Sequence, residues 1–137
     1  MTNSTVARAF FDACESGKGW QVCKQWCTEG ATFSAQADAL AEISTLEGYA
    51  EWMKGLLVLL PNGRYELKAF AEDPDTGSVL AAAVFHGTHS VAGGNGPATG
   101  KSVAADYVYV IDFHNGKIRH MTKIWNDGHS VRQLGWA

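Results

Sequence analysis

The pattern of hydrophobic and polar positions divides the chain into a helical first part and a β-rich second part. Between Val6 and Cys14 the apolar residues recur at spacings of three and four, which is the period of one helix face. We expect this helix to begin at a cap on Ser4 or Thr5 and to end at Glu15.

The next segments predict two further helices and a strand. A short helix is expected over 20–26 and a brief strand over 31–33. Residues 34–45 fit neither period and are expected to form a loop over the mouth of the fold. A long helix is predicted over 46–60, because residues 61–63 read Pro-Asn-Gly and form a strong turn signal.

Four strands are expected after the long helix. Apolar runs separated by turn residues predict an antiparallel meander. The expected strands cover 64–72, 78–90, 101–113 and 117–125.

Length and composition favour one domain with one hydrophobic core over residues 1–137. Hydrophobic residues make up 46% of the chain and five residues are Trp, so we expect some indole surface to line a cavity. The net charge is −3 and the eleven Lys and Arg form no cluster, which argues against binding to nucleic acid or to a membrane surface. Without a leader pattern or a long apolar run, a cytoplasmic protein is expected.

Cysteine usage and motif content argue against several kinds of site. Cys14, Cys23 and Cys27 are odd in number and lie in the first helices, so we expect reduced core thiols. The sequence holds no His/Cys metal set, no phosphate-cradling glycine pattern after a strand and no serine nucleophile elbow. No metal and no cofactor is therefore expected.

Four short motifs in the last third of the chain carry a family resemblance. They are G-T-H at 87–89, P-A-T-G-K at 97–101, G-K-I at 116–118 and R-Q-L-G at 132–135. Together with the order of elements, they resemble the SnoaL-like group of the nuclear-transport-factor-2-like superfamily, whose characterised members are polyketide cyclases. The resemblance implies an α+β cone, in which a strongly bent, mostly antiparallel sheet wraps around helices and leaves an apolar pocket.

The resemblance also implies two catalytic positions, and this chain differs from the family at both. In the cyclases an Asp on the last strand removes a proton next to a carbonyl, and a His on the preceding strand assists. These positions fall on Lys123 and Tyr109.

The turn between the last two strands decides whether Lys123 and Tyr109 share a face. A two-residue turn at Asn115-Gly116 would put them on opposite faces, whereas a three-residue loop over 114–116 with a bulge would put them together. We favour the three-residue loop, because the family needs both positions in its pocket.

With that register, one face of the last two strands is directed into the pocket and the other is directed outward. The inner face is expected to carry Tyr107, Tyr109, Ile111, Met121, Lys123 and Trp125. The outer face is expected to carry Val108, Val110, Ile118, Thr122 and Ile124, an apolar surface that favours a homodimer packed through it.

Several interpretations of Lys123 and Tyr109 remain open. A lysine among aromatic side chains is costly to keep charged, which lowers its pKa unless a carboxylate or an anionic ligand compensates. Lys123 could act as a base or electrostatic catalyst, hold a carboxylate or enolate oxygen of a ligand, or extend from a packed stem to water. Tyr109 could donate its hydroxyl to a carbonyl or oxyanion, or only pack.

Three further residues could supply a base. His89 could reach the pocket or fix the loop that follows it. Asp127 could be a base near the mouth or the cap of a short helix, and Asp38 lies in the loop over the mouth.

The predicted function is cofactor-independent proton transfer, of cyclase or isomerase type, on a small hydrophobic carbonyl or ring compound. The alternative is a non-catalytic protein that binds such a small hydrophobic molecule. The residues expected to contact the ligand are Phe33, Trp52, Leu56, Phe85, Tyr107, Met121 and Trp125.

Overall fold

The computed structural model of the chain describes residues 1–94 and 96–137. Its elements run in the order α1 (Asn3–Glu15), α2 (Trp20–Cys23), the 3-10 turn η1 (Lys24–Trp26), β1 (Cys27–Ala35), the 3-10 turn η2 (Asp38–Leu40), α3 (Leu46–Leu59), β2 (Arg64–Glu72), β3 (Val79–Thr88), β4 (Ser102–His114), β5 (Lys117–Trp125) and α4 (Asp127–Gln133).

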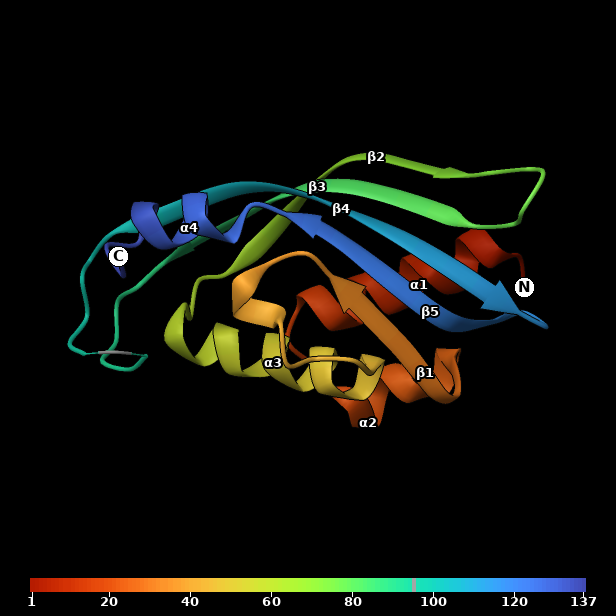
Figure 1. Cartoon of the computed structure of the whole chain (residues 1–137), viewed down its shortest axis with the longest axis horizontal. Helices are drawn as coiled ribbons and strands as arrows, with labels where there is room; N and C mark the ends of the chain where they lie inside the picture. Colours follow the sequence, from red (N-terminus) through yellow and green to blue (C-terminus); the bar gives the residue numbers. More distant parts are fainter. Residues whose placement is uncertain (95) are drawn as a thin grey trace.

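The strands form one curved sheet in the order β1-β5-β4-β3-β2. β1 runs parallel to β5, and the other neighbouring pairs are antiparallel. The sheet arches over α1, α2 and α3, and α4 lies beside the beginning of β4 (Figure 1). The predicted α+β cone, with a bent and mostly antiparallel sheet around helices, is confirmed.

α1 begins at Asn3, because Thr2 caps it rather than Ser4 or Thr5. Thr2 has an extended backbone, and its Oγ1 accepts a hydrogen bond from the backbone N of Thr5 at 3.1 Å. The backbone N and hydroxyl of Ser4 instead donate to Glu72 Oε1 of β2, at 3.1 and 3.0 Å. The start of the helix is thereby tied to the edge strand.

β1 is longer than predicted and leads into a structured loop. It extends over Cys27–Ala35 instead of 31–33, because its residues pair in parallel with β5, a partner that leaves no local pattern in the sequence. Within the segment expected to be a loop, η2 buries Leu40. The backbone N of Ala39 donates to a carboxylate oxygen of Asp127 at 2.8 Å, which fixes this loop to the end of β5.

The turn between β4 and β5 has two residues, so the predicted three-residue loop is wrong. Asn115 and Gly116 have φ values of 49° and 79°, and His114 pairs with Lys117. Both turn residues are therefore in the left-handed region that a two-residue hairpin of type I′ requires.

A bulge next to this turn restores the register that the turn alone would lose. Phe113 pairs with Ile118 but Asp112 pairs with His120, so β5 has one extra residue at this point. Beyond the bulge, Tyr109 pairs directly with Lys123. The two residues share a face, as expected, but for a different reason.

Because of this bulge, the predicted position of Ile118 is wrong. The sequence pattern predicts Ile118 on the outer face, whereas its side chain is fully buried in the core. The side chains switch faces at the extra residue, so Ile118 and Met121 lie on the same side despite their odd spacing. The residues predicted for the inner face are all directed inward: Tyr107, Tyr109, Ile111, Met121, Lys123 and Trp125.

The core lies between the helices and the concave face of the sheet. Cys14, Cys23 and Cys27 are buried and free. Among the described residues, no group of His, Cys, Asp or Glu is arranged to hold a metal ion. Across residues 1–94 and 96–137, no helix has both the length and the apolar composition needed to cross a membrane.

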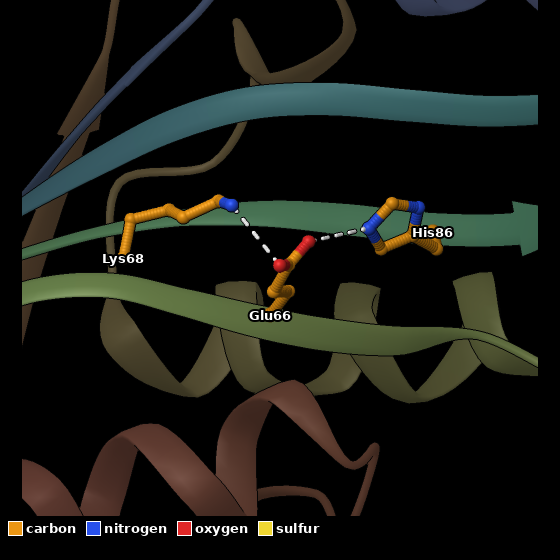
Figure 2. A network of polar contacts seen from close by, with 3 residues as sticks. All are labelled: Glu66, Lys68 and His86. Carbon is orange, nitrogen blue, oxygen red and sulfur yellow. Dashed lines mark hydrogen bonds and ion pairs between the residues drawn. The ribbon is translucent and has the colours of Figure 1, made fainter.

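The outer face of the sheet carries charged as well as apolar side chains. Glu66 of β2 contacts Lys68 at 3.0 Å and His86 of β3 at 3.1 Å (Figure 2). Lys68 and, to a lesser extent, His86 hold the pKa of Glu66 below its usual range. Leu80 and Ile124 are 43% and 60% exposed on the same face.

Replacing Ile118 by Ala is expected to lower the free energy of unfolding by about 2–5 kcal/mol, because the bulge places this side chain in the core. Val58 is 67% exposed on α3 and supplies the control, for which Val58→Ala is expected to change the free energy by less than about 0.5 kcal/mol. Urea denaturation measures both. Equal, small effects would contradict the bulged register.

Candidate functional site

A cavity of about 780 Å³ lies between α3, α4 and the concave face of the sheet. Its wall is mostly apolar and aromatic, and ionisable groups reach it from Glu15, Tyr107 and Lys123. A cavity of this size and composition suits a small hydrophobic molecule. Apolar side chains in the wall include Trp52, Leu56, Phe85, Trp125, Leu134 and Trp136.

Lys123 places an ammonium group inside an aromatic shell. Its side chain is directed inward from β5, and the residue is only 6% exposed. The Nζ atom lies 4.3 Å from the ring centre of Trp125, and four further ring centres lie within 5.1 to 5.8 Å, those of Tyr49, Tyr107, Trp52 and Tyr109. The faces of these rings stabilise a cation that little water can reach.

A continuous chain of hydrogen bonds connects Lys123 to Glu15. Lys123 Nζ donates to the Tyr49 hydroxyl at 2.9 Å. The hydroxyls of Tyr49 and Tyr109 are hydrogen-bonded to each other, and the Tyr109 hydroxyl donates to Glu15 Oε2 at 2.7 Å. The chain thus joins β5, α3, β4 and α1 in one buried network.

The two ends of this chain have opposite charges and shifted pKa values. Burial lowers the pKa of Lys123 to about 8, although the nearby Glu15 carboxylate raises it. Burial raises the pKa of Glu15, which is 1% exposed, while the Lys123 charge and the neighbouring tyrosine hydroxyls lower it. Burial therefore brings the pKa values of Lys123 and Glu15 closer together. Each of the two charges is stabilised by the other.

Tyr107 brings a free hydroxyl to the cavity. This hydroxyl is buried and has no hydrogen-bond partner among the described residues. It lies close to the Glu15 carboxylate without meeting hydrogen-bond geometry, and burial, together with the charge of that carboxylate, raises the pKa of Tyr107 far above the usual range for a tyrosine. A buried, unpaired O–H is a donor that a ligand oxygen could satisfy.

The structure places the predicted contact residues in two groups. Trp52, Leu56, Phe85, Tyr107 and Trp125 line the cavity. Phe33 and Met121 are buried outside the lining. The rings of Phe33 and Tyr49 are stacked with their centres 4.4 Å apart, so Phe33 packs against a member of the hydrogen-bond chain. Tyr109 is likewise fully buried and reaches the cavity only through its neighbours.

His89 fixes the loop after β3 and the C-terminal segment. Its Nδ1 accepts hydrogen bonds from the backbone N of Thr99 and from Trp136 Nε1, both at 3.2 Å. Two donors at Nδ1 require the proton to be on Nε2. His89 is not part of the cavity lining, although Trp136, which it holds, is.

Asp127 and Asp38 also lie outside the cavity lining. Asp127 opens α4, but Asn126 is the N-cap, and the Asp127 carboxylate binds the backbone of Ala39. Asp38 is exposed in η2. Asp127 therefore fixes the loop that contains η2, whereas Asp38 is an exposed side chain of that loop.

Sequence reasoning missed Glu15 and Tyr49. The sequence predicts Glu15 as the end of the first helix. It also follows Phe11 by four residues and so continues the apolar face. Tyr49 occupies a core position of α3 beside Ala50 and Met53. The requirement for a carboxylate near a buried lysine was apparent from the sequence, but which of fourteen acidic residues supplies it was not.

Comparison with known proteins identifies a family for this chain. A family model described as SnoaL-like polyketide cyclase matches residues 5–134. No curated protein sequence matches the chain.

Solved structures of the same fold cover nearly the whole chain. IdmH from Streptomyces antibioticus, a candidate polyketide cyclase, is 18% identical, and the match covers 98% of this chain and 99% of that chain with a TM-score of 0.79. AclR from Streptomyces galilaeus, a candidate hydroxylase, is 16% identical, with coverages of 98% and 96% and a TM-score of 0.78. A SnoaL-like polyketide cyclase from Agrobacterium tumefaciens C58 is 19% identical, with coverages of 98% and 99% and a TM-score of 0.70. At these identities the similarity shows the fold alone.

Replacing Glu15 by Gln is expected to lower the pKa of Lys123 further below about 8, because the carboxylate that favours its charged form is removed. A ¹³C NMR titration of labelled lysine Cε, assigned with Lys123→Met, measures this pKa. Glu51→Gln removes an exposed carboxylate of α3 and is the control, with no change expected. An unchanged or higher pKa in Glu15→Gln would show that the hydrogen-bond chain does not couple the two groups.

Proposed function

Because the chain belongs to the SnoaL-like polyketide cyclase family, we propose that it catalyses a cofactor-independent proton transfer on a small hydrophobic carbonyl or ring compound. The observation that carries this proposal is the buried chain from Lys123 to Glu15, which joins a cation to a carboxylate at the side of an apolar cavity. Both charged groups reach the cavity, so a bound carbonyl compound would meet an electrophile and a base together.

Lys123 and Tyr107 are the groups that activate the carbonyl in this proposal. Removal of a proton next to a carbonyl places negative charge on the oxygen, and a cation in a dry, aromatic environment stabilises that charge more than it would in water. The unpaired Tyr107 hydroxyl supplies a further donor to the same oxygen.

Glu15 is the base that the geometry favours. Its carboxylate reaches the cavity, and burial raises its pKa toward the range in which a carboxylate can both take and return a proton near neutral pH. Tyr109 holds one carboxylate oxygen, Oε2, which orients the group. His89, Asp127 and Asp38 have structural contacts or exposed positions that do not place them in the cavity wall.

The second candidate is a non-catalytic small-molecule binding protein. It is favoured by the loss of the Asp and His that the family resemblance implies, since Lys123 and Tyr109 occupy those positions. In that case Lys123 would hold an acidic group of the ligand, and no reaction would follow.

The proposed activity predicts exchange of protons next to a carbonyl with solvent. Incubation with 2-tetralone and other hydrophobic cyclic ketones in D₂O, followed by ¹H NMR, measures this exchange. Lys123→Met is expected to slow it at least about 100-fold, because the enolate loses its cation. Lys68→Met, which removes an exposed charge on the outer face, is expected to have no effect.

Two further measurements separate the candidates. The double variant Glu15→Gln/Lys123→Met leaves no unpaired buried charge, and its free energy of unfolding, compared with that of Lys123→Met, shows how far the single variant is destabilised by the unpaired Glu15 carboxylate. Ligand binding that quenches tryptophan fluorescence and requires Lys123, without any proton exchange, would favour the binding protein. Neither binding nor exchange would contradict both candidates.

We also propose that the protein is a cytoplasmic homodimer that packs through the outer face of the sheet. Leu80 and Ile124 expose apolar surface there, beside the half-buried Val108 and Val110. Burial of such a surface between two copies would stabilise the pair.

Replacing Ile124 by Lys is expected to convert this dimer to a monomer, because two ammonium groups would be brought into an apolar interface. Light scattering coupled to size-exclusion chromatography measures the mass. Val58→Lys places the same charge on an exposed position of α3 and is expected to leave the dimer intact. A monomeric wild-type protein would contradict the proposal.

A further inference from the structure

We propose that Lys123 activates the carbonyl covalently, by forming a Schiff base with it through Nζ. This inference rests on the proposed function, because both require a carbonyl group at Lys123. It goes further in assigning the chemical step, and it restricts the substrate to an aldehyde or ketone with an accessible carbonyl carbon.

The position of Lys123 meets the requirements for such a nucleophile. Its side chain lines the cavity, and the surrounding rings of Trp125, Tyr49 and Tyr107 limit the access of water to Nζ. Lysines in hydrophobic pockets are favoured for imine formation, because loss of water destabilises the ammonium form relative to the free amine. Limited access of water also protects the imine from hydrolysis.

The hydrogen-bond chain provides a route for the proton that Lys123 must lose. Lys123 donates to Tyr49 and Tyr109 donates to Glu15, and the two hydroxyls are bonded to each other. Tyr109 gives its one hydroxyl proton to Glu15, so Tyr49 is the donor to Tyr109, and every bond runs from the ammonium toward the carboxylate. One proton shift along each bond converts the buried ion pair into a free amine and a carboxylic acid.

Burial lowers the cost of this shift, because the shift replaces two charges by two neutral groups. Burial lowers the pKa of Lys123 and raises that of Glu15, so both changes act in the direction of proton transfer. Each hydroxyl gives up one proton and receives another, so neither tyrosine changes its charge.

The addition and dehydration steps balance with the groups present. The Nζ lone pair forms a bond to the carbonyl carbon, and the carbonyl π electrons move to oxygen. A proton then passes from the nitrogen to this oxygen, for which the free Tyr107 hydroxyl supplies a relay. Loss of water follows when the carboxylic acid of Glu15 protonates the departing hydroxyl, which leaves a protonated imine and a carboxylate.

The protonated imine restores the charges of the resting site. It puts a positive nitrogen where the ammonium was, among the same aromatic rings, and the Glu15 carboxylate is again negative. That carboxylate can then remove the proton from the carbon next to the imine, which gives an enamine and needs no oxidant or cofactor. Hydrolysis by one water molecule releases the product and the lysine.

Reductive trapping with cinnamaldehyde tests the inference. The protein is incubated with the aldehyde and sodium cyanoborohydride at pH 7.5, and peptide mapping by mass spectrometry locates the reduced adducts. The other six lysines are all exposed and serve as internal controls: Lys18, Lys24, Lys54, Lys68, Lys101 and Lys117. We expect Lys123 to be labelled at least about tenfold faster than any of them, because a lower pKa gives it a larger fraction of free amine.

Two variants and a pH series sharpen the result. Lys123→Arg retains a cation but cannot form an imine, and it should lose the fast adduct, whereas Lys68→Arg should retain it. Tyr109→Phe interrupts the proton route and should slow labelling of Lys123 at pH 7.5 by about tenfold. In the wild type, the labelling rate should rise with pH and level off above about 8.

Slow labelling of Lys123, no faster than the exposed lysines, would overturn the inference, and this comparison needs only the wild-type protein. The outcomes also separate it from the proposed function. Solvent exchange of ketone protons without fast trapping would leave the proposed function standing and reject the Schiff base. Fast trapping at Lys123 without exchange would support the Schiff base and reject proton transfer.

Discussion

The burial of one ammonium group, that of Lys123, constrains the rest of this structure. A lysine that lies 6% exposed among aromatic rings cannot retain a charge unless an opposite charge and several polar atoms accompany it. Glu15 supplies the opposite charge, and the hydroxyls of Tyr49 and Tyr109 connect the two. The side chains that α1, α3, β4 and β5 contribute to the site are therefore explained by one requirement, the stabilisation of this buried charge.

The sheet meets this requirement through its register. Lys123 is directed inward only because an extra residue in β5 offsets the two-residue turn at Asn115-Gly116. The same offset moves Ile118 into the core and leaves Ile124 outside. One irregularity thus sets both the packing of Ile118 at one end of the β4–β5 hairpin and the inward direction of Lys123 at the other.

The sequence predicts the elements of this fold well wherever their causes are local. The bounds of β2 and β5 and the start of α3 agree with the predicted residues, because turn residues and hydrophobic runs mark them. β1 was predicted too short, because its parallel partner is distant in sequence. The pattern does not predict the length of the turn after His114, because an extra residue in the strand and an extra residue in the turn have the same effect on side-chain direction.

For the site, the sequence indicated Lys123 and Tyr109 but not the groups that accompany them. A family resemblance pointed to the two strand positions, and the structure shows that they are paired. Glu15 and Tyr49 belong to helices whose apolar spacing is equally consistent with packing alone. Their role depends on three-dimensional proximity, since the hydrogen bond from Tyr109 to Glu15 spans 94 positions and that from Lys123 to Tyr49 spans 74.

These separations have a consequence for how the molecule folds. Synthesis produces Glu15 long before β5 exists, so α1 cannot bury an ionised carboxylate at its final place until the last strand has arrived. Until then, the helix must leave that end hydrated or keep the acid protonated. The hydrogen-bond chain from Lys123 to Glu15 can therefore be completed only late in folding, and a topology that depends on such distant contacts is expected to fold slowly.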